Sequence, residues 1–142
     1  MQWKSALATV VMAGAMAGGS TLALAPAAQA APPKPGCLGA RAFCFWYNSN
    51  QTGSVAGWDL NTGFRGFQNL ADAGKFLTSG NGQGVPVKNN AASATYQFPG
   101  NCGGSVDVYF NSGWTGASDN VPACSGVNLV KTKNNNASFY RN

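Results

Sequence analysis

The stretch Lys88-Asn89-Asn90-Ala91-Ala92-Ser93 recurs as Lys133-Asn134-Asn135-Asn136-Ala137-Ser138. An earlier pair of matching stretches precedes these two, Trp46-Tyr47-Asn48-Ser49 and Tyr109-Phe110-Asn111-Ser112. A glycine follows each aromatic stretch at the same distance, at Gly53 and at Gly116. Two matches in the same order indicate an internal duplication, in which each half runs from an aromatic strand to an asparagine-rich corner.

Each half has the residues that a compact β unit needs at its turns. Glycine after the aromatic stretch can adopt a positive φ, which lets a hairpin fold over its own strand. Asparagine tolerates the left-handed region, and a serine hydroxyl can tie a loop down. We therefore expect an all-β fold in which two units of about four strands pack as a Greek-key sandwich. The first half is longer, with its extra residues between Asp59 and Gly84.

Short runs punctuated by Gly, Asn, Pro and Ser predict strands rather than helices. In Ser105–Phe110, Val106, Val108 and Phe110 alternate with polar positions, as in a half-buried strand. Other expected strands are 42–47, which is more apolar, and the weaker 94–98 and 137–141. One short turn or helix is expected at 71–77. The glycine-rich 80–84 is expected to be a mobile loop, because it has neither the strand nor the helix of a nucleotide-binding motif.

The N-terminus has the pattern of a secretory signal peptide. Lys4 precedes an uncharged apolar run, and Ala28-Gln29-Ala30 is the small-x-small pattern of a cleavage site. We expect residues 1–30 to be removed, 31–36 to form a Pro-rich spacer, and 37–142 to form one secreted domain. The alternative, a membrane anchor, is disfavoured by the Gly-Ala-rich composition and the break at Pro26.

The chain has four cysteines, Cys37, Cys44, Cys102 and Cys124, all within the expected domain. An even number in an exported chain predicts two disulfides. Three pairings are possible, and Cys37–Cys44 with Cys102–Cys124 is the simplest because each closes a local loop.

Composition argues against an enzyme and against binding of nucleic acid or membranes. The chain has no histidine, which excludes Ser-His-Asp and Cys-His arrangements. Its acidic residues are four aspartates, and a two-carboxylate glycosidase using Asp59 and Asp119 is formally possible but has no support from spacing. The net charge of +5, or +4 without Lys4, is spread along the chain without a basic run.

The aromatic stretch, the glycine and the Asn-Asn-x-x-Ser corner together resemble the Greek-key motif of the βγ-crystallins. The export signal and the early Cys37-x6-Cys44 spacing resemble peptidase inhibitor family I36, which is known from actinomycetes. This resemblance covers about 37–142. It implies a βγ-crystallin-like double Greek-key sandwich, and it implies inhibition of peptidases, metallopeptidases above all.

The crystallin resemblance also implies a calcium signature at each corner. The corresponding ligands here are Asn89, Asn90 and Ser93 in the first copy, and Asn134, Asn135 and Ser138 in the second. Both copies lack the final serine of the signature and have no carboxylate, so any calcium site is expected to be weak. A hydrogen-bonded turn that locks the Greek key is the alternative. No other cofactor is expected.

The expected partner is a secreted peptidase, bound by a monomer through a rigid loop in the protease cleft. Candidate loops are 48–53, 80–84 and 111–116. Trp58 and Trp114 lie among Gly, Asn and Asp and are candidate anchors for a partner. The alternative function is a crystallin-like binding module or antifungal toxin that recognises cell-wall polysaccharide.

Overall fold

The computed structural model describes Cys37, Gly100 and residues 41–60, 63–98 and 102–142. The predicted signal peptide and spacer lie outside these described residues. The regular elements are eight strands and one 3-10 helix: β1 (Ala42–Asn48), β2 (Thr52–Asp59), β3 (Gly66–Phe67), η1 (Leu70–Ala73), β4 (Ser93–Tyr96), β5 (Ser105–Asn111), β6 (Thr115–Pro122), β7 (Ser125–Asn128) and β8 (Ser138–Arg141). The all-β prediction is confirmed, and no helix in the described part of the chain is long and apolar enough to cross a membrane.

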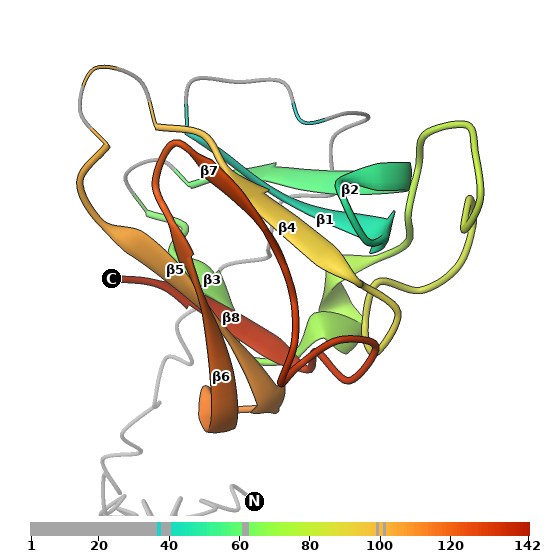
Figure 1. Cartoon of the computed structure of the whole chain (residues 1–142). Helices are drawn as coiled ribbons and strands as arrows, with labels where there is room; N and C mark the ends of the chain where they lie inside the picture. Colours follow the sequence, from blue (N-terminus) through green and yellow to red (C-terminus); the bar gives the residue numbers. More distant parts are fainter. Residues whose placement is uncertain (1–36, 38–40, 61–62, 99, 101) are drawn as a thin grey trace, which may run out of the picture.

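The strands form two antiparallel four-stranded sheets, ordered β2-β1-β4-β7 and β3-β8-β5-β6. Figure 1 shows the first sheet in the upper part of the view and the second below and to the left of it. The third strand of each half joins the sheet of the other half, because β3 pairs with β8 and β7 pairs with β4. Neither sheet is therefore built from one half of the chain alone.

Equivalent irregularities occur in the two hairpins. The β1–β2 register shifts between Trp46 and Asn48, and the β5–β6 register shifts between Tyr109 and Asn111. A bulge of this kind changes the face on which the following side chains lie. The alternation predicted for β5 is confirmed at Val106 and Val108, which are buried, but it is wrong at Phe110, which is 43% exposed.

An aromatic cluster between the two sheets forms the main core. Phe139 of β8 is fully buried at its centre, with its ring 4.6 Å from that of Phe43 and 5.7 Å from those of Phe45 and Phe67. The Trp58 ring lies 5.8 Å from that of Phe139. These rings come from both halves, so the core joins the halves as the exchanged strands do.

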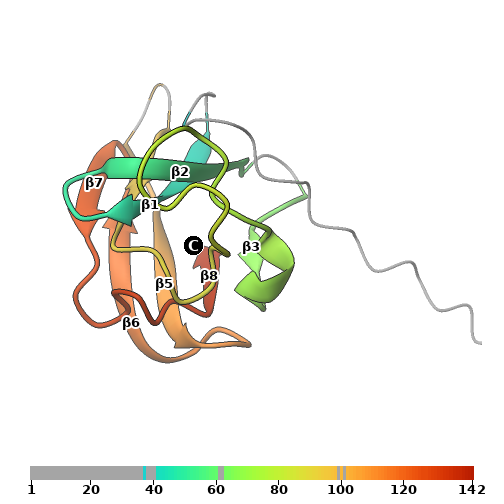
Figure 2. The same ribbon diagram turned by 90° about the vertical axis from the view of Figure 1, so that its right-hand side faces the viewer.

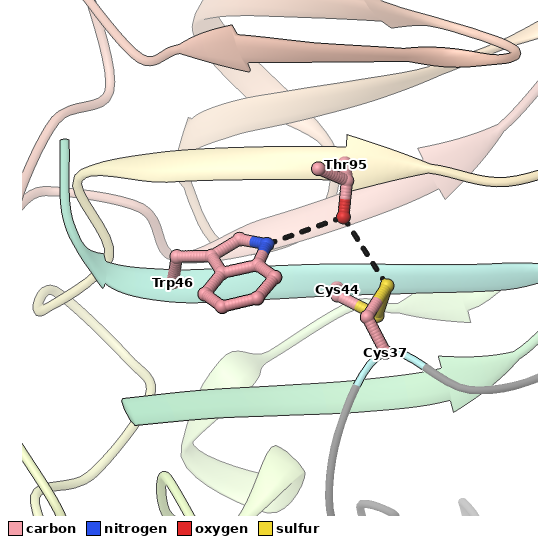
Figure 3. The surroundings of a disulfide bond; sticks show 4 residues. All are labelled: Cys37, Cys44, Trp46 and Thr95. Atoms are coloured by element: carbon pink, nitrogen blue, oxygen red, sulfur yellow. Dashed lines mark hydrogen bonds between the residues drawn. A yellow bond between two sulfur atoms is a disulfide. The ribbon is translucent and has the colours of Figure 1, made fainter. Parts of the chain in front are cut away.

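A second, small core lies on the opposite face of β1 and explains why this strand is apolar on both faces. Ala42, Cys44 and Val55 are buried there, with Cys37 and Trp46 packed against them. The Cys37–Cys44 disulfide covers this face. Figure 3 shows how β4 supports it: the Thr95 hydroxyl lies 3.2 Å from Cys37 Sγ and accepts a 3.2 Å hydrogen bond from Trp46 Nε1.

The insertion of the first half covers the edge of β2, as Figure 2 shows. Ser54 N donates to Asn81 O (2.8 Å), and the Ser54 hydroxyl donates to Thr78 O (2.6 Å). Gly82 lies so close to Tyr47 that a Cβ there would be 2.1 Å from the ring. Residues 80–84 form a loop, as expected, and hydrogen bonds and the Gly82–Tyr47 contact hold this loop against β2 and β1. The expected helix at 71–77 is only the 3-10 turn η1, which begins at an Asn69 cap.

The disulfides follow the simplest of the three pairings, Cys37–Cys44 and Cys102–Cys124. The second spans 22 positions and joins the loop before β5 to the turn between β6 and β7. Each half of the chain therefore contains one cross-link.

Candidate functional site

The first hairpin turn is fixed by one buried hydroxyl. Ser93 Oγ, at the start of β4, donates to Asn48 O (2.7 Å) and accepts from Gln51 N (3.0 Å). Gln51 has φ 54°, in the left-handed region, which turns the hairpin toward the corner. The corner of the first half thus holds the hairpin of the same half in place.

The second half repeats this arrangement. Ser138 Oγ donates to Asn111 O (2.6 Å) and accepts from Trp114 N (3.1 Å), and Trp114 has φ 60°. A Cβ on Gly116 would lie 2.8 Å from Asn111 Nδ2, much as a Cβ on Gly53 would lie 2.9 Å from Asn48 Nδ2. The duplication found in the sequence is therefore also a duplication of hydrogen bonds.

The two asparagine corners face each other across the middle of the molecule. Asn89 N donates to Asn136 O (2.9 Å), and Asn134 N donates to Ala91 O (2.8 Å), so each corner bonds to the other. Asn89 and Asn134 are both left-handed, with φ 62° and 54°. The buried Asn136 side chain adds two more hydrogen bonds to the first half: its oxygen accepts from Ala91 N, and its nitrogen donates to Val87 O.

The predicted calcium ligands lie at these corners, where several of their side chains already form hydrogen bonds within the protein. The Ser93 and Ser138 hydroxyls are fully buried and are already hydrogen-bonded to their hairpins. The Asn90 and Asn135 amides donate to the backbone carbonyls of Lys88 and Lys133. Calcium needs six to eight oxygens, and no group of three or more acidic, His or Cys residues exists among the described residues. Calcium binding stays a prediction that titration must test.

The ammonium group of Lys88 lies beside the second hairpin, β5–β6. Lys88 Nζ lies 2.8 Å from Asn69 Oδ1 and 3.3 Å from Ser112 Oγ, and it links the first corner to the second hairpin. Beside the other hairpin, a cavity of about 300 Å³ is lined by polar and aromatic residues from both halves: Tyr47, Asn48, Ser49, Asn90, Ala92, Lys133 and Asn134. A lysine at each place makes these sites unfavourable for a metal cation.

The two candidate tryptophans differ from the prediction. Trp58 is 2% exposed and lies in the aromatic core, so it cannot contact a partner, and its assignment as an anchor is wrong. Trp114 is half-buried, and its indole Nε1 donates to Phe67 O (3.1 Å) and to Phe139 O (3.0 Å). Its ring lies 4.8 Å from that of Tyr140. Trp114 therefore has a structural role, joining the second hairpin to β3 and β8.

Asp119 of β6 organises a turn that the sequence did not predict. Its carboxylate accepts from the backbone N–H groups of Val130 (3.0 Å), Lys131 (3.2 Å) and Thr132 (2.8 Å), and from the Thr132 hydroxyl (2.8 Å). Partial burial acts to raise the pKa of Asp119, but the hydrogen bonds from Thr132, Lys131 and Val130 outweigh it, and the pKa lies below its ordinary value.

This carboxylate is thus committed to holding a loop, which makes it a poor candidate for acid-base chemistry. Asp59 ends β2 in the other sheet, so the two aspartates of the formal glycosidase alternative are on different sheets. All cysteines of the described residues are paired, and none is free to act as a nucleophile.

Comparisons with protein-family profiles, with curated proteins and with solved structures found no match for this chain.

Proposed function

We propose that this chain is a secreted inhibitor of peptidases, with a βγ-crystallin-like double Greek-key fold of the type implied by its resemblance to family I36. The exchange of the third strand between the halves and the two serine-locked hairpins support the Greek-key assignment. The expected target is a metallopeptidase, bound by a monomer.

The observation that carries this proposal is that hydrogen bonds fix each of the main connecting segments to a strand or a corner. Both hairpins are tied to a corner, the insertion is tied to β2, and the β7–β8 turn is tied to Asp119. Two disulfides add further restraint. A pre-ordered loop loses little conformational entropy when it enters a cleft, and it resists the distortion that hydrolysis requires. Such a surface suits a protein that must contact a peptidase without becoming its substrate.

The experiment is an inhibition assay with the purified, oxidised residues 31–142. Thermolysin-like, subtilisin-like and trypsin-like peptidases are each titrated with the protein, and residual hydrolysis of a chromogenic peptide is measured. The proposal expects stoichiometric inhibition of at least one class, with the thermolysin-like enzyme first. No inhibition of any class at micromolar concentration would count against it.

The alternative function is binding of cell-wall polysaccharide. An exposed tryptophan could stack on a sugar ring, but every tryptophan of the described residues is buried or half-buried. The remaining surface aromatic pair is Trp114 with Tyr140, and the Arg65 guanidinium lies 5.3 Å from the Tyr140 ring centre. Retention on chitin, glucan or peptidoglycan that is lost in Tyr140→Ala would favour this alternative over inhibition.

A further inference from the structure

In the turn between β7 and β8, two consecutive exposed residues are flanked on each side by a buried residue. Leu129 is 1% exposed and Thr132 is fully buried, whereas Val130 is 80% exposed and Lys131 is also exposed. Val130 is the most exposed of the large apolar side chains in the described chain, well above Phe110 at 43% and Leu77 at 40%. An apolar side chain held out in this way costs free energy in the isolated protein, and it gains most when a partner covers it.

The backbone of this projection is fixed from inside. Three successive N–H groups, from Val130 to Thr132, converge on the single Asp119 carboxylate, and Leu129 N donates to Ala92 O (3.0 Å). The loop is therefore ordered before any partner arrives. The Asp119 carboxylate is already hydrogen-bonded to this backbone, so the outward face carries Val130 beside the Lys131 and Lys133 side chains, which are exposed.

The loops predicted from the sequence offer less to a partner. The first hairpin, 48–53, consists of Asn, Ser, Gln, Thr and Gly, and the loop 80–84 consists of Gly, Asn and Gln. The one large apolar residue of 111–116 is Trp114, whose indole N–H is bonded to the protein itself. Phe110, next to the second hairpin, and Leu77 are each less than half exposed, whereas Val130 is 80% exposed and so has the most apolar surface for a partner to cover.

We propose that Val130, with Lys131 beside it, is the anchor that enters the target cleft, and that the partner presents an apolar subsite next to acidic groups. This inference rests on the proposed function, because it names the docking segment of that inhibitor. It differs from the loops expected from the sequence, and it needs no metal and no chemical step.

The test compares four variants in the inhibition assay, after thermal melting has shown which of them fold like the wild type. Val130→Asp places a charge in the apolar subsite and is expected to weaken inhibition about a hundredfold, and Val130→Ala about tenfold. Val130→Ile keeps the apolar anchor and should inhibit within about threefold of the wild type. Leu77→Asp is the matched control on another exposed apolar residue, and it should leave inhibition unchanged.

The possible outcomes distinguish the Val130 anchor from the proposed function as an inhibitor. Wild-type inhibition that is lost in Val130→Asp and kept in Leu77→Asp and Val130→Ile supports the anchor. Wild-type inhibition that is equally strong in Val130→Asp overturns the anchor and leaves the inhibitor proposal standing. A wild-type protein that inhibits no class of peptidase in the panel overturns both.

Discussion

Replacing either corner serine by alanine should destabilise the protein by a similar amount. In Ser138→Ala, Asn111 O and Trp114 N both lose the partner that they now share. In Ser93→Ala, Asn48 O and Gln51 N lose theirs. Because the two serines form equivalent hydrogen bonds, we expect the two substitutions to lower the free energy of unfolding by similar amounts.

The magnitude follows from the hydrogen bonds. Each contributes about 0.5–1.5 kcal/mol net, and a polar group left without a partner costs about 1–3 kcal/mol when it is buried. Ser138 is fully buried, but Asn111 is exposed, so water can recover part of the loss at its carbonyl. We therefore expect a loss of about 2 kcal/mol for each variant, or a fall of about 9 °C in Tm for a domain of this size.

The measurement is guanidinium denaturation followed by tryptophan fluorescence, with both disulfides intact. Ser118→Ala is the control, since the Ser118 side chain forms no hydrogen bond to a described residue, and it should change stability by less than about 0.5 kcal/mol. Should both corner variants behave like this control, the hydroxyls would not brace the hairpins. A large loss at only one corner would mean that the two halves are not energetically equivalent.

Three further predictions concern the core, a cross-link and pH. Phe139→Ala should cost about 3–5 kcal/mol in the same denaturation assay, because it empties the centre of a core shared by both sheets, and a smaller loss would show that the core can collapse around the site. Removing Cys102–Cys124 by double alanine substitution should cost about 3 kcal/mol from its 22-position loop, and a loss below 1 kcal/mol would contradict the cross-link's role. The pKa of Asp119 in the folded protein lies below its unfolded value of about 3.9. The carboxylate therefore stabilises the folded state fully above about pH 3.9, and this stabilisation is lost as the pH falls through the lower folded pKa. Asp119→Asn should therefore flatten the fall of Tm between about pH 5 and pH 2, and a slope equal to that of the wild type would rule this out.

The fold was predictable from the sequence where local chemistry dictates it. Asn and Gly at fixed offsets gave the turns, and the repeated Lys-Asn-Asn-x-Ala-Ser gave two equivalent corners, which the hydrogen bonds of Ser93 and Ser138 reproduce. The apolar run of β1 predicts a buried strand, and the Cys37–Cys44 disulfide covers the second of its two buried faces.

The edge strands and the surface turn were not predictable in this way. β6 reads Thr-Gly-Ala-Ser-Asp-Asn-Val-Pro, which has no apolar alternation, and it forms by pairing with β5. The polar sequence neighbours of Trp58 suggest exposure, but the aromatic rings that bury it come from other strands, β1, β3 and β8. Val130 is not among the residues predicted to contact a partner, because the sequence does not show that Asp119 binds the backbone of this turn while the Val130 side chain lies exposed.

The position of β8 makes the fold depend on contacts between residues far apart in the sequence. This strand comes last along the chain, yet it lies inside its sheet between β3 and β5 and supplies the central ring of the core. Without β8, Phe43 and Phe45 lose their contacts with the Phe139 ring. Such dependence on distant contacts slows folding to about milliseconds or seconds and favours an all-or-none transition. We therefore expect a chain exported as proposed to reach its native fold only once β8 has paired with both β3 and β5.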